Sequence, residues 1–177
     1  MAGPADESAL AARMFEQHGS AIRRYLRRLT GDSEVAADLT QDVYLRVVRH
    51  APQYEPRERE RAWLFRIARN VFLDHVKLRA RSPEAGSVEG VAVSAPAQAI
   101  RVDLDAALRQ LDETDREAFL LCEVAGLRYD EIGPLLGLTV AGVRSRIYRA
   151  RLALREMLMP PAPLASIQHV RSHGDDD

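Results

Sequence analysis

The chain has 177 residues and a formal net charge of −1 at pH 7, so its overall charge points to no particular partner. A hydrophobic content of 46% is enough to build a core and excludes a wholly disordered protein. The single cysteine, Cys122, excludes an intrachain disulfide and a cysteine-rich zinc site. No apolar run approaches the roughly 20 residues of a membrane span, and the N-terminus lacks the pattern of a secretory signal. We therefore expect a soluble protein of a reducing compartment.

The first 81 residues predict three helices joined by short connections. Large apolar side chains recur there at spacings of three and four residues, as on the buried face of a helix. Gly31 can end the first helix, and Asp32 or Ser33 can cap the second. A polar loop that contains Pro52 and Pro56 precedes the third helix. The expected helices cover residues 7–30, 33–50 and 62–81.

A second helical block follows a stretch of different composition. Residues 82–100 hold two prolines, two glycines, three serines and no basic residue, which predicts a flexible linker. The chain after Pro160 has the composition of a disordered tail. No segment alternates like a strand, so we predict an all-α protein with two helical domains. The expected boundaries are a first domain at 1–81, the linker at 82–102, a second domain at 103–159 and the tail at 160–177.

The second domain is expected to contain four helices. Thr114 and Glu117 have the spacing of a capping box and would start the second of these helices, which Gly126 would end. Gly137 provides a turn, and Thr139 can cap the last helix. The final two helices have the pattern of a helix-turn-helix and are expected at residues 129–136 and 140–158.

Two parts of this nearly neutral chain are basic. Residues 13–81 contain 15 basic and nine acidic residues, and residues 139–155 contain five arginines and no acid. Two basic surfaces indicate two contacts with a polyanion, although solvated helix faces can have the same composition.

Helical spacing gives the last helix a face that suits a DNA groove. Its buried stripe leaves small and polar residues on the opposite side, next to arginines that match guanine or phosphate. A plain helical hairpin with a solvated basic face is the alternative. The outward residues are Ala141, Ser145, Tyr148 and Leu152, flanked by Arg144 and Arg149.

Motifs in both blocks resemble one family. The first block carries LTGD at 29–32, DLTQDVYLR at 38–46 and AWLFRIARN at 62–70. The second block carries REAF at 116–119, GLRYDEI at 126–132 and GVRSRIYRAR at 142–151. These look like regions 2 and 4 of the extracytoplasmic-function (ECF, group IV) sigma factors of the sigma-70 superfamily. The resemblance implies a cytoplasmic bacterial protein that directs core RNA polymerase to promoters, recognises two promoter elements and assists strand opening.

The resemblance also implies three sets of functional residues. The set similar to the surface that docks on the polymerase is Asp38, Gln41, Asp42, Leu45 and Arg46. The set similar to the part that captures the melted minus-ten strand is Tyr54, Arg57, Arg59, Arg61, Arg66, Arg69 and Asn70. The set that would face the minus-thirty-five element is Thr139, Ala141, Arg144, Ser145, Tyr148 and Arg149. Arg146 and Arg151 fit phosphate contacts or internal ion pairs better.

Some positions within the motifs leave alternatives open. Trp63 is expected in the core, whereas Phe65 fits either the core or a base-stacking surface. Arg128 stands where the family has a small capping residue. Pro134 removes a backbone donor from a short helix, which we therefore expect to be kinked or displaced.

The partners that the resemblance implies are core RNA polymerase, through its β′ clamp helices and β subunit, promoter DNA and an anti-sigma factor. We expect no cofactor, metal or catalytic activity, because the sequence lacks phosphate-loop, HExxH and Gly-x-Ser-x-Gly motifs. Cys122 lies among apolar residues, and the pair His169 and His173 falls in the predicted tail.

Two other functional classes remain open at this point. A one-site transcriptional regulator would use only the helix-turn-helix, with the first domain as a sensor or dimerisation unit. A carboxylate-dependent nuclease would cleave plain DNA in the presence of a divalent metal. Co-purification with core polymerase separates the first from a sigma factor, and a cleavage assay separates the second.

Overall fold

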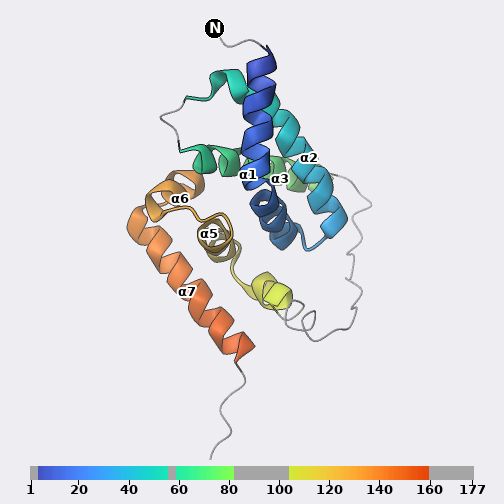
Figure 1. The fold of residues 1–177 in the computed structure, drawn as a ribbon. Helices are drawn as coiled ribbons and strands as arrows, with labels where there is room; N and C mark the ends of the chain where they lie inside the picture. The colour runs from blue at the N-terminus through green and yellow to red at the C-terminus, as the bar shows by residue number, and fades with distance from the viewer. Residues whose placement is uncertain (1–3, 56–58, 82–103, 160–177) are drawn as a thin grey trace, which may run out of the picture.

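The structure is a computed structural model that describes residues 4–55, 59–81 and 104–159 (Figure 1). Every regular element in these three ranges is a helix, which confirms the predicted all-α fold. The predicted linker and tail lie outside the described residues, and so does Arg57. Among the helices of the described ranges, none is long and apolar enough to cross a lipid bilayer.

The first domain consists of three long helices and one short turn. Helix α1 covers Pro4–Thr30, α2 Ser33–His50, the 3-10 turn η1 Ala51–Gln53 and α3 Glu60–Arg81. Gly31, with a φ angle of +72°, follows α1 in the left-handed conformation that glycine adopts readily, as predicted. The side chain of Asp32 accepts hydrogen bonds from the backbone N–H groups of Glu34 and Val35 at 2.8 and 3.1 Å. Asp32, rather than Ser33, is therefore the N-cap of α2.

The second domain begins with helical residues 104–110 and continues as a compact set of three helices. These are α5 (Glu113–Glu123), α6 (Tyr129–Leu136) and α7 (Val140–Leu158). The capping box predicted at Thr114 is wrong. Asp112 caps α5 instead, because its carboxylate accepts hydrogen bonds from the N–H groups of Thr114 and Asp115 at 3.0 and 3.3 Å. The carboxylate of Glu117 is consequently available for a contact outside its own helix.

The helix-turn-helix formed by α6 and α7 is closely packed. Helix α6 continues through the exposed Pro134, so the proline does not interrupt it. At its start, the backbone N–H of Arg128 donates to the Glu131 carboxylate at 2.7 Å, which compensates for the missing small cap. A Cβ atom on Gly133 would lie 2.7 Å from the carbonyl oxygen of Leu138, so only glycine permits this approach of α6 to the turn. As predicted, Thr139 caps α7.

The two domains share one hydrophobic core, which the sequence does not predict. Helix α1 packs against α5, and α3 packs against α6 (Figure 1). Tyr25 of α1 and Phe65 of α3 are fully buried near this contact, with ring centroids 5.4 Å apart in an edge-to-face arrangement. Trp63 is a core residue as expected. Phe65, which the sequence allowed in either the core or a base-stacking surface, also lies in the core.

Candidate nucleic-acid interface

The outward face of α7 is the first surface that suits DNA. Val143 and Ile147 are buried against the rest of the domain, which leaves the opposite side of the helix in solvent. Tyr148 on that side is 66% exposed. The hydroxyl of Thr139 accepts a hydrogen bond from the Gly142 N–H at 3.1 Å, so this residue acts as a cap at the edge of the face. All six residues of the predicted minus-thirty-five set are exposed: Thr139, Ala141, Arg144, Ser145, Tyr148 and Arg149.

One carboxylate of α5 holds two arginines of α7. Asp115 is only 7% exposed. Arg149 donates to it through Nε and Nη2, both at 2.9 Å, and Arg146 donates through Nη1 at 3.0 Å. Arg146 also donates to Asp112 at 3.2 Å. Burial by itself would raise the pKa of Asp115, but the hydrogen bonds from the two arginines outweigh it and hold that pKa below its usual value.

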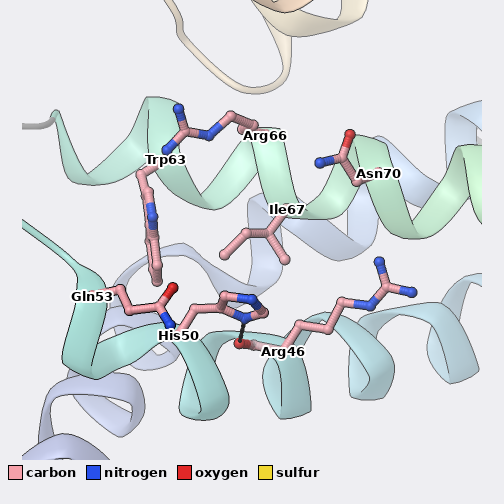
Figure 2. Close-up of a pocket in the computed structure, with 7 residues that line it drawn as sticks. All are labelled: Arg46, His50, Gln53, Trp63, Arg66, Ile67 and Asn70. Carbon is pink, nitrogen blue, oxygen red and sulfur yellow. Dashed lines mark hydrogen bonds between the residues drawn. The ribbon is translucent and has the colours of Figure 1, made fainter.

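A second candidate surface is a pocket between α3, the end of α2 and η1 (Figure 2). Its volume of about 350 Å³ lies within the range of roughly 300–1,000 Å³ that is typical of small-ligand sites. In Figure 2, the Trp63 indole and the Ile67 side chain point from α3 toward α2 and η1, and the polar ends of Arg66 and Asn70 point away from α2. The pocket is lined by Arg46, His50, Gln53, Trp63, Arg66, Ile67 and Asn70.

The residues that line this pocket differ in part from the set that the sequence predicts. Arg46, assigned to the polymerase surface, reaches the pocket and forms an ion pair with Asp74 of α3 at 2.9 Å. The sequence does not single out His50, whose Nδ1 donates to the Arg46 carbonyl at 2.8 Å, or Gln53. Only the packing of α2 against α3 shows that these polar residues line the same pocket as Asn70. The only sequence signal for this arrangement was the four-residue spacing between Arg46 and His50 near the end of α2.

Tyr54 packs against Trp63, which forms the aromatic wall of the pocket. Its ring packs on Trp63 with centroids 5.0 Å apart and a tilt of 55° between the planes. Tyr54 is half-buried and belongs to the core that surrounds Trp63. The structure therefore places Tyr54 against the aromatic wall of the pocket rather than among the residues that line it.

Arg69, a predicted minus-ten residue, faces the second domain. Its Nε and Nη2 atoms donate to the two carboxylate oxygens of Glu117 at 2.7 and 3.2 Å. The hydroxyl of Tyr25 lies 3.4 Å from the same carboxylate. Burial and the nearby Glu117 charge raise the pKa of Tyr25 well above its usual value, so this hydroxyl stays protonated and can donate.

Two further arginines of the predicted minus-ten set lie at the same domain contact. Arg59 forms ion pairs with Glu131 at 3.0 Å and with Asp130 at 3.6 Å, both on α6. The guanidinium of Arg61 lies beside Gly126, where an added Cβ atom would come within 2.6 Å of its Nη1. The described arginines of the predicted minus-ten set are thus divided between the pocket, which Arg66 lines, and the domain contact.

The exposed face of α2 is the third candidate surface. Asp38, Gln41 and Asp42 are exposed there, and Leu45 is 52% exposed although it is a large apolar residue. The buried residues of α2, such as Leu39 and Val43, lie on its other side. Four of the five residues predicted to dock on the polymerase therefore share an accessible surface, and Arg46 is the exception.

Both halves of the chain match known protein families. Residues 14–82 match Sigma-70 region 2, and residues 101–154 match Sigma-70, region 4. The chain is 33% identical to the RNA polymerase sigma factor CarQ of Myxococcus xanthus over 151 residues, which cover 82% of this chain and 87% of CarQ. It is 32% identical to the ECF RNA polymerase sigma factor EcfG of Rhodopseudomonas palustris over 142 residues, which cover 77% and 78%. The chain belongs to the ECF family of RNA polymerase sigma factors.

Other matches agree with this assignment. This sigma factor is 38% identical to the ECF RNA polymerase sigma factor SigE of Mycolicibacterium smegmatis over 165 residues, which cover 86% of the chain but only 64% of SigE. Among solved structures, the sigma factor RpoE from Bartonella quintana, in complex with the anti-sigma factor NepR, has 28% identity and a TM-score of 0.72. The match covers 83% of this chain and 95% of RpoE.

The charge of Asp115 leads to a prediction about stability and pH. We expect Asp115 to make its full contribution to the free energy of unfolding at neutral pH and to lose this contribution on acidification. Because its pKa is depressed in the folded sigma factor, the contribution is full above the unfolded-state pKa of about 3.9 and disappears as the pH falls through the lower folded-state pKa.

Urea unfolding of the wild type and of Asp115→Asn at pH 7 and at about pH 3 measures this effect. The difference in the free energy of unfolding between the two proteins should shrink at the acidic pH. A difference of the same size at both pH values would contradict the prediction.

Proposed function

We propose that this sigma factor contacts core RNA polymerase through the exposed face of α2 and reaches promoter DNA through two surfaces, the α3 pocket and the outward face of α7. The observation that supports this most is that each domain has its own accessible surface of suitable chemistry. A pocket with an aromatic wall and polar rim lies in the part that matches region 2. An exposed, acid-free helix face lies in the part that matches region 4.

The pocket is proposed to take an unstacked base of the melted minus-ten strand. An extruded base requires an apolar or aromatic wall and hydrogen-bonding groups for its edge. Trp63 and Ile67 supply the wall, and the amide of Asn70 supplies a donor and an acceptor. Arg66 at the rim is proposed to contact the backbone of the strand.

Arg59 and Arg69 are proposed to bind strand phosphates only after the two domains move apart. Both arginines pair with carboxylates of the second domain, so these contacts compete with any phosphate. Arg61, which is exposed beside Gly126, would become more accessible in the same movement. Binding of DNA at α3 is thus coupled to opening of the domain contact.

On the second domain, α7 is proposed to enter the major groove of the minus-thirty-five element. The small side chains of Ala141 and Ser145 allow close approach of the helix to base edges. Tyr148 offers an exposed ring for apolar contact, and Arg144 and Arg149 offer charged donors.

The likeness to RpoE supports one more partner. RpoE was solved in complex with the anti-sigma factor NepR, and we propose that an anti-sigma factor also holds this chain. We further propose that the protein has no catalytic activity of its own and acts in the cytoplasm through the polymerase.

Run-off transcription with bacterial core RNA polymerase on a genomic library tests the proposed function. Transcripts that start at defined sites only when this protein is added would support it. A protein that binds DNA through α7 without binding core polymerase would instead be a one-site regulator. Metal-dependent cleavage of the template would indicate a nuclease.

The α2 surface gives a specific prediction. Asp42→Arg should lower the affinity for core polymerase by at least about tenfold, because reversing a charge within a docking surface removes an attraction and adds a repulsion. Pull-down of core polymerase by tagged protein at several concentrations measures this loss. The matched control is Glu16→Arg, which makes the same charge change at an exposed position of α1. Equal binding of core polymerase by both variants would show that the exposed face of α2 is not the docking surface.

A further inference from the structure

We propose that Asp115 is a positioning residue for promoter recognition, which holds Arg149 in the orientation that reads a guanine of the upstream element. This proposal rests on the proposed function, in which α7 enters the major groove. It adds a residue of α5 that the sequence motifs do not assign to DNA recognition.

The hydrogen bonds of Arg149 leave one edge of its guanidinium free. Its Nε and Nη2 atoms each donate to one oxygen of Asp115, at 2.9 Å in both cases. This pairing uses the side edge of the guanidinium. The end edge, formed by Nη1 and the second hydrogen of Nη2, still has two parallel N–H donors. Two such donors match the O6 and N7 acceptors of guanine in the major groove.

The position of the carboxylate makes it a fixed support. Asp115 lies in the first turn of α5, where its own backbone N–H donates to the Asp112 cap at 3.3 Å. Arg146 adds a further hydrogen bond to Asp115 at 3.0 Å. The carboxylate is therefore buried and held from several sides, whereas about half of the Arg149 side chain is exposed. A rigid support beneath an exposed arginine lowers the entropy that the side chain loses when it binds a base.

Arg144 provides a contrast on the same helix face. It is exposed, and within the described part of the chain it makes no hydrogen bond or ion pair. Its guanidinium is therefore suited to a phosphate contact, which requires a positive charge but no fixed orientation of the side chain. The two flanking arginines of α7 are therefore suited to different contacts, with Arg149 directed at a base edge.

A purely structural role for Asp115 predicts a different response to mutation. If the carboxylate only fastened α5 to α7, its loss would weaken all DNA binding together with stability. If it orients Arg149, its loss removes preference for guanine at one position. Removal of a negative charge close to the DNA would at the same time maintain or raise the affinity for duplexes of any sequence.

The experiment compares the wild type with Asp115→Asn and with a matched control, Asp112→Asn. The control removes the same charge and keeps a favoured N-cap residue, and in the described structure Asp112 accepts a hydrogen bond from Arg146 whereas Arg149 donates its hydrogen bonds to Asp115. Each full-length protein, bound to core polymerase, is incubated with duplexes randomised over the upstream element. The retained duplexes are sequenced and compared with the starting pool.

We expect the wild type and Asp112→Asn to enrich the same sequence, with guanine at one or more positions. Asp115→Asn should lose the preference for guanine at one of them by roughly tenfold and retain the others. Replacement of that guanine by 7-deazaguanine, which lacks the N7 acceptor, should weaken binding by the wild type but not by Asp115→Asn. Arg149→Lys, which keeps the charge but lacks the fork, should lose the same preference and provides a test independent of Asp115.

Unchanged preferences in Asp115→Asn would overturn the proposal, and so would an equal loss at all positions with reduced thermal stability. A wild type that enriches a sequence without any guanine would also overturn it, while leaving the role of α7 intact. A wild type that enriches no sequence at all would instead contradict the proposed function itself.

Discussion

Replacement of Glu117 by glutamine is expected to weaken the contact between the two domains and to strengthen the binding of single-stranded DNA to α3. Glu117 of α5 is 8% exposed and accepts two hydrogen bonds from Arg69 of α3. The hydroxyl of Tyr25 from α1 donates to the same carboxylate. One carboxylate thus connects α1 and α3 of the first domain to the second domain.

The size of the effect follows from the burial of this group. Removing one partner of a buried ion pair typically costs about 3–5 kcal/mol, because the other charge remains without compensation. Glutamine keeps the shape and one acceptor, and the side chain of Arg69 is 22% exposed, so we expect a smaller loss of about 2 kcal/mol in the free energy of unfolding. Arg69 is then no longer neutralised and becomes available to a phosphate.

Two measurements with opposite expected signs test this prediction. Urea unfolding should show the loss of stability, and fluorescence anisotropy with a labelled single-stranded minus-ten oligonucleotide should show several-fold tighter binding. The matched control is Glu123→Gln, on the same helix, because Glu123 pairs with Arg151 and interacts with Cys122, and both partners belong to the second domain. Lower stability without a gain in DNA binding would mean that Arg69 is a structural residue and not a phosphate contact.

The helices and most of their ends are predictable because local chemistry determines them. Gly31 adopts a left-handed conformation after α1, and Thr139 caps α7, as their residue types and positions indicate. The buried stripe and the exposed face of α7 follow directly from the 3.6-residue period of the helix. At the start of α5 the prediction fails, because the Thr114–Glu117 spacing indicated a capping box although the carboxylate of Asp112 is the cap.

The contact between the domains has no comparable signal. Glu117 looks like the second half of a capping box, and Arg69 looks like one of several arginines that bind phosphate. Their pairing joins residues 48 positions apart on either side of the predicted linker. Spacing rules describe neighbours within one helix, so they contain no information about which residues of two helices meet. The same limit explains why His50 and Gln53 were not expected in the pocket that Asn70 lines.

Asn70→Ala is expected to impair strand opening far more than docking on duplex DNA. Asn70 lines the pocket opposite Arg46 and His50, and its exposed amide offers both a donor and an acceptor to a base edge. Loss of one or two hydrogen bonds to an extruded base, at about 1–1.5 kcal/mol each, corresponds to a reduction of roughly tenfold to a hundredfold in open complex. The duplex contacts proposed for α7 do not involve this pocket, so docking should change little.

Permanganate reactivity of thymines in the minus-ten element measures strand opening, and gel-shift titration with core polymerase on the closed promoter measures docking. The matched control is Lys77→Ala, an exposed position further along α3 and outside the pocket. Equal reduction of opening and docking by Asn70→Ala would argue against base capture.

A coupling test identifies the captured base itself. A promoter with an abasic site at each position of the minus-ten strand in turn is combined with the wild type and with Asn70→Ala. At the captured position, loss of the base should reduce opening by the wild type to the level of the variant and should have no further effect on the variant. Additive losses at every position would show that Asn70 and the base do not interact. In that case, the pocket would be a structural feature of the packing between α2 and α3.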